Sequence, residues 1–411
     1  MNKFLLKQII AKWQSNIWIV IELLLVSVIF WYIVDSLYVI NKYESMPMGY
    51  NTDHCYLITP GIISNKSPLM TNIPEDERNF GKGLQSLLIK MKHRPEVEAA
   101  CVVYSSMYPY GVGHSYTQTA YIDENDSISW CNSVYYQQTT SQYPIVFSIH
   151  GANGETPEEL ADILKKDNYL FSTNAFSRDD VKPEQFINKR VLLDGNQGML
   201  GAVIPPRRDH AYDMPSEYAI YNAKITGWYG QIAIRVKPQF DNNIVESLFN
   251  DIKNLQSGSV IISDIQSFAD IKRNYEMDHE LENRNFVVIA VFLLINIFLG
   301  VFGTFWFRTR QNIKEIALRK VTGASDKQIF FRIISEAIIL LVIATIPAIG
   351  IDIYIAHNEL TKTFFEYIGW ERTGGCITAT FLLLAFITIV GVAIPASNAM
   401  KAKPAIVLKE E

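Results

Sequence analysis

The residue types that usually carry catalysis are present in this chain, but their spacing completes no reactive site. His279 and Glu280 begin an HExxH zinc-binding pattern, yet position 283 is Asn, so the second histidine ligand is missing. The sequence has no GxSxG turn for a nucleophilic serine and no GxxxxGK[ST] loop for a nucleotide phosphate. We therefore expect a non-catalytic chain with no catalytic, metal-binding or cofactor-binding residue of its own.

The four cysteines, Cys55, Cys101, Cys131 and Cys376, are too few for a disulfide scaffold, and no CxxC pair is present. In an oxidising compartment Cys101 and Cys131 could form a disulfide. The spacing does not choose between this pairing and one that joins Cys55 to either of them.

The composition favours a membrane protein with a large polar insert. Hydrophobic residues make up 49% of the 411 residues, charged residues only 19%, and the net charge is −5. The low charge and high apolar content exclude a wholly disordered protein, and the acidic balance argues against a nucleic-acid partner.

Four apolar segments are long enough to cross the hydrocarbon core of a membrane, which needs about 20 helical residues. They cover residues 16–34, 286–307, 333–355 and 377–395. A cleaved signal peptide is the alternative for the first segment, but Trp31, Tyr32 and Asp35 stand where a small-residue cleavage site should lie. We therefore predict a membrane protein with four transmembrane α-helices.

The distribution of Lys and Arg predicts the orientation, because positively charged short segments stay in the cytoplasm. The N-terminal tail carries Lys3, Lys7 and Lys12 and no acidic residue. The segment 308–332 carries seven Lys and Arg against two acidic residues. Both termini are therefore expected in the cytoplasm, and the long segment between the first two spans is expected outside.

Three acidic residues, Glu22, Glu336 and Asp352, fall within or at the start of the apolar spans. A charge at the bilayer centre costs about 2.5–3.5 kcal/mol on insertion scales, so such residues need polar surroundings. We expect Glu22 to face a dimer seam or to lie near the inner interface.

The outer segment is expected to fold as a large α+β domain between the first and second transmembrane helices. The predicted elements are strands at 101–104, 229–236 and 260–262 and helices at 84–91 and 245–255. In strand 229–236 the alternation places Ile232, Ile234 and Val236 on one face.

Both helices that flank this domain should extend past the membrane surface, because neither Gly nor Pro interrupts residues 2–46 or 266–299. The outer part of the second helix, 271–281, has a sparse apolar stripe that suits a narrow helix-to-helix seam. A simple juxtamembrane linker is the alternative.

The segment 308–332 contains a short amphipathic helix that is expected to lie at the membrane surface and to dock on a cytoplasmic partner. Its apolar face is formed by Ile313, Ile316, Ala317 and Val321, and its polar faces carry Lys314, Glu315, Arg319 and Lys320. Gly323 is expected to end this helix with a left-handed cap, and Ser325 with Gln328 to form the capping box of the next one. A generic interfacial helix is the alternative.

The run from Glu315 to Ser325, EIALRKVTGAS, resembles the motif after the second span in the MacB/FtsX-like (LolC/LolE-like) family of ABC transporter permeases. Glu336 falls where that family usually has a glutamate, and the closing residues 399–408 are similar to the family's basic stretch with Pro and Leu. The resemblance is specific over residues 285–411.

The resemblance implies a type VII ABC permease-like chain that passes the energy of ATP hydrolysis to work outside the membrane, a mechanism called mechanotransmission. It also implies a second permease subunit, a separate ABC ATPase that binds ATP and Mg, location in the bacterial inner membrane and, as a further candidate partner, a periplasmic adaptor. Lys314, Glu315, Ile316, Arg319, Lys320 and Gly323 would then form the ATPase-coupling helix and its turn.

The expected division of the chain follows from these predictions. It comprises the first helix and its stalk at 1–45, a MacB-like periplasmic core domain at 46–265, the second stalk and helix at 266–307, the coupling segment at 308–332, the third helix at 333–355, an external loop at 356–376, the fourth helix at 377–395 and a cytoplasmic tail at 396–411.

The expected activity is export or release of a peptide, an antibiotic or a lipoprotein. An FtsX-like transducer that activates cell-wall hydrolases is the alternative, but it predicts a smaller external domain. A membrane sensor is a third hypothesis, and it predicts an appended signalling domain for which the cytoplasmic segments leave no room.

Overall fold

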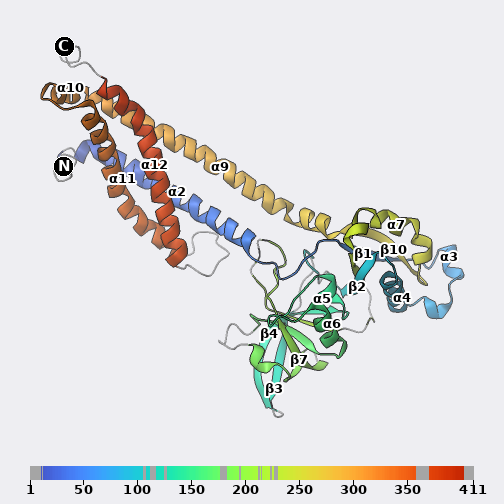
Figure 1. The fold of residues 1–411 in the computed structure, drawn as a ribbon. Coiled ribbons are helices and arrows are strands. Elements are labelled where there is room, and N and C mark those ends of the chain that lie inside the picture. The colour runs from blue at the N-terminus through green and yellow to red at the C-terminus, as the bar shows by residue number, and fades with distance from the viewer. Residues whose placement is uncertain are drawn as a thin grey trace. The chain divides into compact units, whose positions relative to one another are not determined.

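The computed structural model describes residue 11 and residues 13–104, 108–111, 117–124, 127–175, 183–193, 196–211, 213, 215–222, 225, 230–357 and 370–401 of the 411-residue chain. The chain divides into two compact units (Figure 1). Met1–Ser45 together with Glu280–Glu411 form the membrane unit, and Met46–His279 form the α+β unit.

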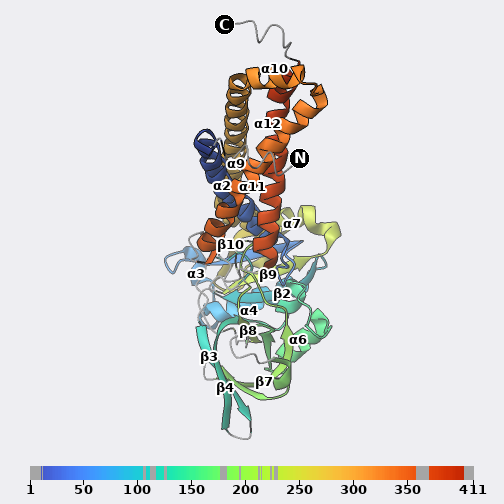
Figure 2. The same cartoon turned by 90° about the vertical axis from the view of Figure 1, so that its left-hand side faces the viewer.

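Four helices among the described residues are long and apolar enough to cross a membrane, which confirms the four predicted spans. They are α2 (Trp13–Ser45), α9 (Phe268–Gln311), α11 (Asp326–His357) and α12 (Trp370–Met400). The predicted extension of the second helix is also present, because α9 runs for 44 residues, about 66 Å at helical rise. The short helix α10 (Ile313–Val321) connects α9 to α11 and lies across the ends of the long helices (Figure 2).

One helix start agrees with the prediction and another differs from it. Helix α11 begins at Asp326, directly after Ser325, because Ser325 and Gln328 form the predicted capping box. The Gln328 amide nitrogen donates to Ser325 Oγ at 3.3 Å, and the Ser325 amide nitrogen donates to Gln328 Oε1 at 3.0 Å. Helix α12 begins at Trp370, so residues 370–376, which were expected in the external loop, are helical.

The early start of α12 is explained by a buried ion pair between α12 and α2. The Arg372 guanidinium binds both carboxylate oxygens of Asp35, with Nε to Oδ1 at 2.7 Å and Nη2 to Oδ2 at 2.5 Å. The two side chains are 10% and 2% exposed. Because Asp35 neutralises Arg372, a charged residue can lie within an apolar helix without reaching water.

Glu22 on α2 contacts α9 of the same chain. Its Oε2 accepts a hydrogen bond from Thr304 Oγ1 at 3.1 Å. Gly300 leaves room for the carboxylate, since a Cβ there would lie 3.0 Å from Glu22 Oε1. Thr304 lies one helical turn before Arg308, the first charged residue after the apolar run of α9.

The first part of the α+β unit is a four-stranded antiparallel sheet in the order β10-β1-β9-β2. Its strands are β1 (Cys55–Ile62), β2 (Val97–Tyr104), β9 (Gly230–Val236) and β10 (Val260–Ser267). The helices between them are α3 (Pro68–Thr71), α4 (Phe80–Lys92), α7 (Ile244–Asn250) and α8 (Ile252–Leu255), with the 3-10 turns η1 (Glu75–Glu77) and η4 (Pro238–Asn243). All the predicted strands and helices are therefore found, with the helical stretch 245–255 divided into α7 and α8.

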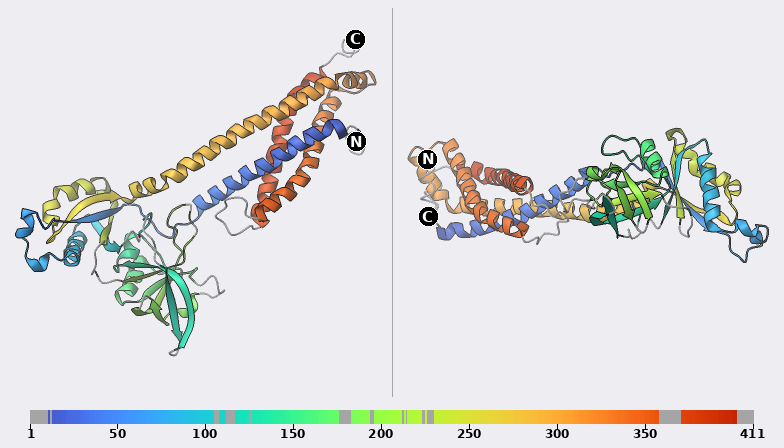
Figure 3. Two further views of the ribbon diagram at one scale, coloured as in Figure 1. Left: turned by 180° about the vertical axis from the view of Figure 1, so that it is seen from behind. Right: turned by 90° about the horizontal axis from the view of Figure 1, so that it is seen from below.

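The second part of the α+β unit is a barrel of six described strands (Figure 3). They follow the order β4-β3-β6-β7-β5-β8, and β8 pairs back with β4 to close the barrel. The strands are β3 (Thr117–Glu124), β4 (Ser127–Thr139), β5 (Tyr169–Ser172), β6 (Arg190–Leu193), β7 (Asn196–Ile204) and β8 (Tyr218–Asn222). The helices of this part are α5 (Tyr143–Val146), α6 (Pro157–Lys165) and the 3-10 turn η3 (Pro183–Phe186).

The four-stranded sheet is buried on both faces. One face, with Ile232, Ile234 and Val236 as predicted, forms a core with α4 and α7. The other face, with residues such as Leu57 and Ala233, forms a second core with α5 and α6. Because alternate side chains of a strand point to opposite faces, this sheet forms the centre of the α+β unit.

Helix α9 begins on the second of these cores. Its first residue, Phe268, is fully buried there, and Ile271 is packed against the same cluster. One turn further, His210 lies against the rings of Tyr275 and His279. Of the predicted apolar stripe, Ile271 and Tyr275 make these contacts, whereas Met277 and Leu281 are exposed.

The expected disulfide between Cys101 and Cys131 is not formed. Cys101 is a free thiol on β2, fully buried in the core of the α+β unit. Strand β4 meets β2 at the pair Val103↔Thr139, and Cys131 lies eight residues along β4 from that point, about 26 Å in an extended strand. A disulfide requires Cα atoms within about 7 Å. The side chain of Cys131 lies outside the described residues.

We expect the thiols of Cys55 and Cys101 to react only when the α+β unit unfolds. Burial raises the pKa of both, to about 12 for Cys55, so neither forms the reactive thiolate at neutral pH. Iodoacetamide labelling followed by mass spectrometry should modify both residues in denaturant and neither in the folded protein. A Cys101–Cys131 cross-linked peptide in a non-reducing digest would contradict this structure.

Replacement of Arg372 by Met should destabilise the membrane unit, because it leaves the Asp35 carboxylate buried without a counter-charge. The loss expected from removing one partner of a buried ion pair is about 3–5 kcal/mol. The double variant Asp35→Leu, Arg372→Met removes both charges and should recover most of the loss. Thermal unfolding in detergent measures both effects, and equal stability of the single and double variants would contradict the pairing.

Candidate functional site

The candidate functional site is the turn formed by α9, α10 and α11, which contains all six residues predicted for the coupling helix and its turn. Gly323 ends α10 with a backbone φ of +99°, a conformation that residues with a Cβ rarely adopt. Its amide nitrogen donates to the carbonyl of Lys320 at 3.1 Å, and that of Ala324 donates to Arg319 at 3.0 Å. This left-handed cap was predicted, and it turns the chain sharply from α10 into α11.

The inner face of α10 fixes this helix to the membrane unit. Ile316 is 8% exposed and Ala317 is fully buried. Ile316 forms a small core with Ile329 of α11 and Ala399 of α12. The Ile316 side chain is therefore covered by helices of its own chain, so it supports the coupling helix from the inside.

The charged residues of α10 make intramolecular contacts that hold the turn in place. Arg319 donates to Glu315 Oε1 through Nη2 at 2.7 Å and through Nε at 3.2 Å. Lys320 binds Asp326 Oδ1 of α11 at 2.7 Å and donates to the Met400 carbonyl of α12 at 2.5 Å. These contacts make α10 part of a rigid end of the membrane unit.

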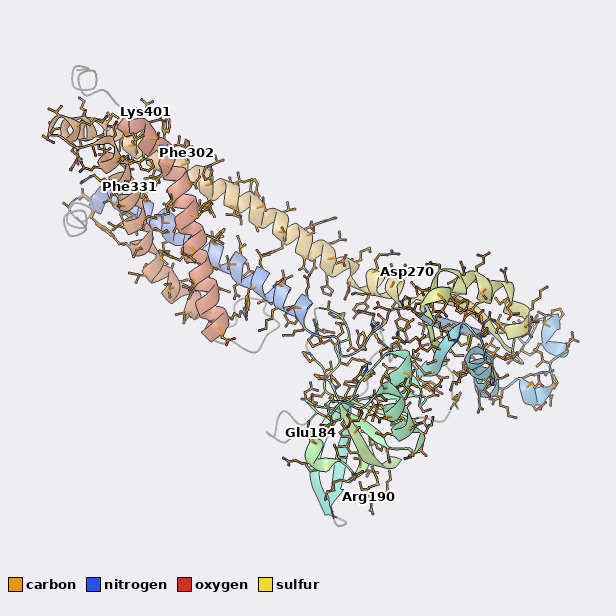
Figure 4. The ribbon with its side chains drawn as sticks, viewed as in Figure 1. Glu184, Arg190, Asp270, Phe302, Phe331 and Lys401 are labelled. Atoms are coloured by element: carbon orange, nitrogen blue, oxygen red, sulfur yellow. The ribbon has the colours of Figure 1, made fainter. Side chains whose placement is uncertain are left out.

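The outer face of α10 is exposed and apolar. Leu318 is 57% exposed and Val321 is 63% exposed, with the exposed side chain of Lys314 one turn before Leu318. Leu318 was not among the residues predicted for this site, and Val321 was predicted to lie on the same face as Ile316. Phe331, near the start of α11, is 60% exposed and lies on the outside of the same end (Figure 4).

The three acidic residues predicted in the spans have different surroundings. Glu336 forms an ion pair with Arg308 of α9, with Oε1 and Nη2 separated by 2.5 Å. Glu22 contacts Thr304, as described above. Asp352 is 2% exposed, and its Oδ1 has no hydrogen-bond donor among the described residues. Glu336 and Glu22 therefore belong to two separate contacts, and neither contact includes Asp352.

No group of three or more His, Cys, Asp or Glu side chains that could hold a metal ion is found in the described part of the chain.

The residues of the coupling turn divide into those that shape and stabilise the turn and those that form its exposed face. Glu315, Arg319 and Lys320 stabilise the turn, Gly323 shapes it, and the exposed face consists of Lys314, Leu318 and Val321.

Comparison with known proteins relates about half of the chain to a macrolide exporter. Over 218 residues the chain is 24% identical to the macrolide export ATP-binding/permease protein MacB of Bdellovibrio bacteriovorus. The match covers 51% of this chain, which spans about a third of the length of that relative.

Two solved structures also resemble this chain. The periplasmic region of MacB from Actinobacillus actinomycetemcomitans has 14% identity and a TM-score of 0.35, over 57% of this chain and 98% of the other. The extracellular domain of the ABC-type transporter YknZ from Gram-positive bacteria has 12% identity and a TM-score of 0.31, over 51% of this chain and 100% of the other.

A family model described as the FtsX-like permease C-terminal domain matches residues 287–404. The matched range contains the apolar part of α9 and the whole of α10, α11 and α12, so it includes the exposed turn described above. Residues 287–404 of this chain therefore carry an FtsX-like permease C-terminal domain.

Proposed function

We propose that this chain is the permease subunit of an ABC transporter and that a separate ATPase docks on the outer face of α10. The exposed apolar side chains of Leu318 and Val321 in an FtsX-like permease domain carry this proposal. Exposed apolar residues beside a basic side chain are suited to a groove on a protein partner. ATP and Mg would be bound by that partner.

The inner face of α10 supports a mechanical role for this contact. Ile316 packs between α11 and α12, and Lys320 binds residues of both. A partner that moves the outer face of α10 would therefore move the ends of α11 and α12 with it. A closely packed interior transmits displacement because it has low compressibility.

Helix α9 would carry the movement to the α+β unit. It begins at Phe268, directly after strand β10, and continues to Gln311, next to α10. Ser267 stabilises its start, since Ser267 Oγ accepts a hydrogen bond from the Asp270 amide nitrogen at 3.0 Å. An unbroken helix without Pro can pass a displacement along its length, which is the mechanotransmission expected from the sequence.

The proposed orientation places α10 and both termini in the cytoplasm and the α+β unit outside the bacterial inner membrane, as the distribution of Lys and Arg indicates. The work done there would be export or release of a peptide, an antibiotic or a lipoprotein. A second permease subunit and a periplasmic adaptor are further proposed partners.

Replacement of Leu318 by Asp should reduce the recovery of the ATPase about tenfold or more, because a charge would be placed in an apolar contact. The variant and the unchanged protein would be purified from their native membrane by affinity tag, and bound proteins would be identified by mass spectrometry. ATP hydrolysis by the recovered complex provides a second measurement, and it should fall in parallel.

The control is Leu69→Asp, because Leu69 of α3 is 60% exposed and therefore resembles Leu318 in type and exposure. This variant should recover the ATPase as the unchanged protein does. Equal recovery from the Leu318 and Leu69 variants would disprove the docking face. Ile316→Asp is unsuitable, since a buried Asp would disrupt the turn itself.

A further inference from the structure

A basic pocket lies between the end of α9, helix α10 and the start of α11, and Leu318 is not among the residues that line it. Three arginines line it, Arg308, Arg319 and Arg332, together with the carboxylates Glu315 and Glu336. The three guanidinium groups exceed the two carboxylates by one positive charge. The pocket is therefore suited to a ligand with one negative charge.

The ion pairs within the pocket leave one strong donor without an acceptor. Arg308 uses Nη2 to bind Glu336, and Arg319 binds Glu315. Nη1 of Arg308 is buried and has no hydrogen-bond acceptor among the described residues, and the side chain as a whole is 11% exposed. A buried guanidinium N–H is costly to leave unpaired, so the geometry favours an acceptor supplied by a bound group.

The position of Arg308 along α9 places this donor at the depth of lipid phosphates. No charged residue lies between Arg284 and Arg308. That stretch measures about 34 Å at helical rise, close to the thickness of the hydrocarbon core of about 30 Å. Arg308 therefore lies where the apolar core ends and the headgroups begin.

We propose that this pocket binds the headgroup phosphate of an anionic phospholipid in the leaflet on the α10 side. Nη1 of Arg308 would donate to a phosphate oxygen, and the excess positive charge would balance the phosphodiester. Guanidinium groups are well suited to phosphate because they are planar and weakly hydrated. Basic pockets between transmembrane helices are known binding sites for lipid headgroups.

The proposal requires only that the helices span a membrane, so it does not depend on the ATPase. A bound lipid would contact α9, α10 and α11 together and would stiffen the turn that presents Leu318. A free phosphate ion offers the same chemistry as the headgroup, and the experiment has to separate the two sources.

The test is native mass spectrometry of the delipidated full chain in detergent, titrated with phosphatidylglycerol or with phosphatidylethanolamine of the same acyl chains. The unchanged protein should bind phosphatidylglycerol more tightly. Arg308→Gln should weaken this binding about tenfold or more, the effect of losing a charged hydrogen bond. Arg310→Gln is the matched control, since Arg310 lies two residues away, is exposed and stacks on Trp306.

Glu336→Gln separates binding from a structural effect, because it also breaks the Arg308–Glu336 ion pair but leaves the arginine in place. It should bind phosphatidylglycerol at least as tightly as the unchanged protein, since it removes a negative charge from the pocket. Equal losses in the Arg308 and Glu336 variants would overturn the proposal, as would unchanged binding in Arg308→Gln. Displacement of the lipid by inorganic phosphate at similar concentration would assign the pocket to the free ion instead.

Discussion

The membrane unit depends on polar contacts that join its long apolar helices to one another. Asp35 binds Arg372 between α2 and α12, Glu336 binds Arg308 between α11 and α9, and Glu22 accepts a hydrogen bond from Thr304 between α2 and α9. Apolar side chains can slide past one another at little cost, whereas such contacts require one relative position of the helices. Together they link all four long helices and fix their register.

The turn at α10 uses its two faces for different purposes. Its inner face is part of the core of the membrane unit, and Lys320 holds it to α11 by an ion pair with Asp326 and to α12 by a hydrogen bond to the Met400 carbonyl. Its outer face exposes apolar side chains that no described residue covers. The turn therefore combines a packed inner face with an exposed apolar outer face.

The sequence predicted the features that depend on local pattern. These are the four spans, the long α9, the elements of the first sheet, the capping box of Ser325 and Gln328 and the cap at Gly323. It failed where the answer depends on distant parts of the chain. Val321 was placed on the same apolar face as the buried Ile316 but is exposed, and the pairing of cysteines depends on where β4 meets β2. The barrel was not predicted, because its closure joins β4 to β8 across about 80 residues.

The α+β unit has a consequence for how such proteins diversify. Strand β2 ends at Tyr104, which pairs with Gly230 at the start of β9, so the chain leaves the first sheet and returns to it at neighbouring points. The barrel is built entirely from residues between those points. Barrel strands β5, β7 and β8 nevertheless supply Leu170, Ala202 and Ile220 to the core that buries one face of the sheet and Phe268. Evolution can therefore change the outer surface of the barrel without affecting the sheet, but only if these core-facing side chains are kept.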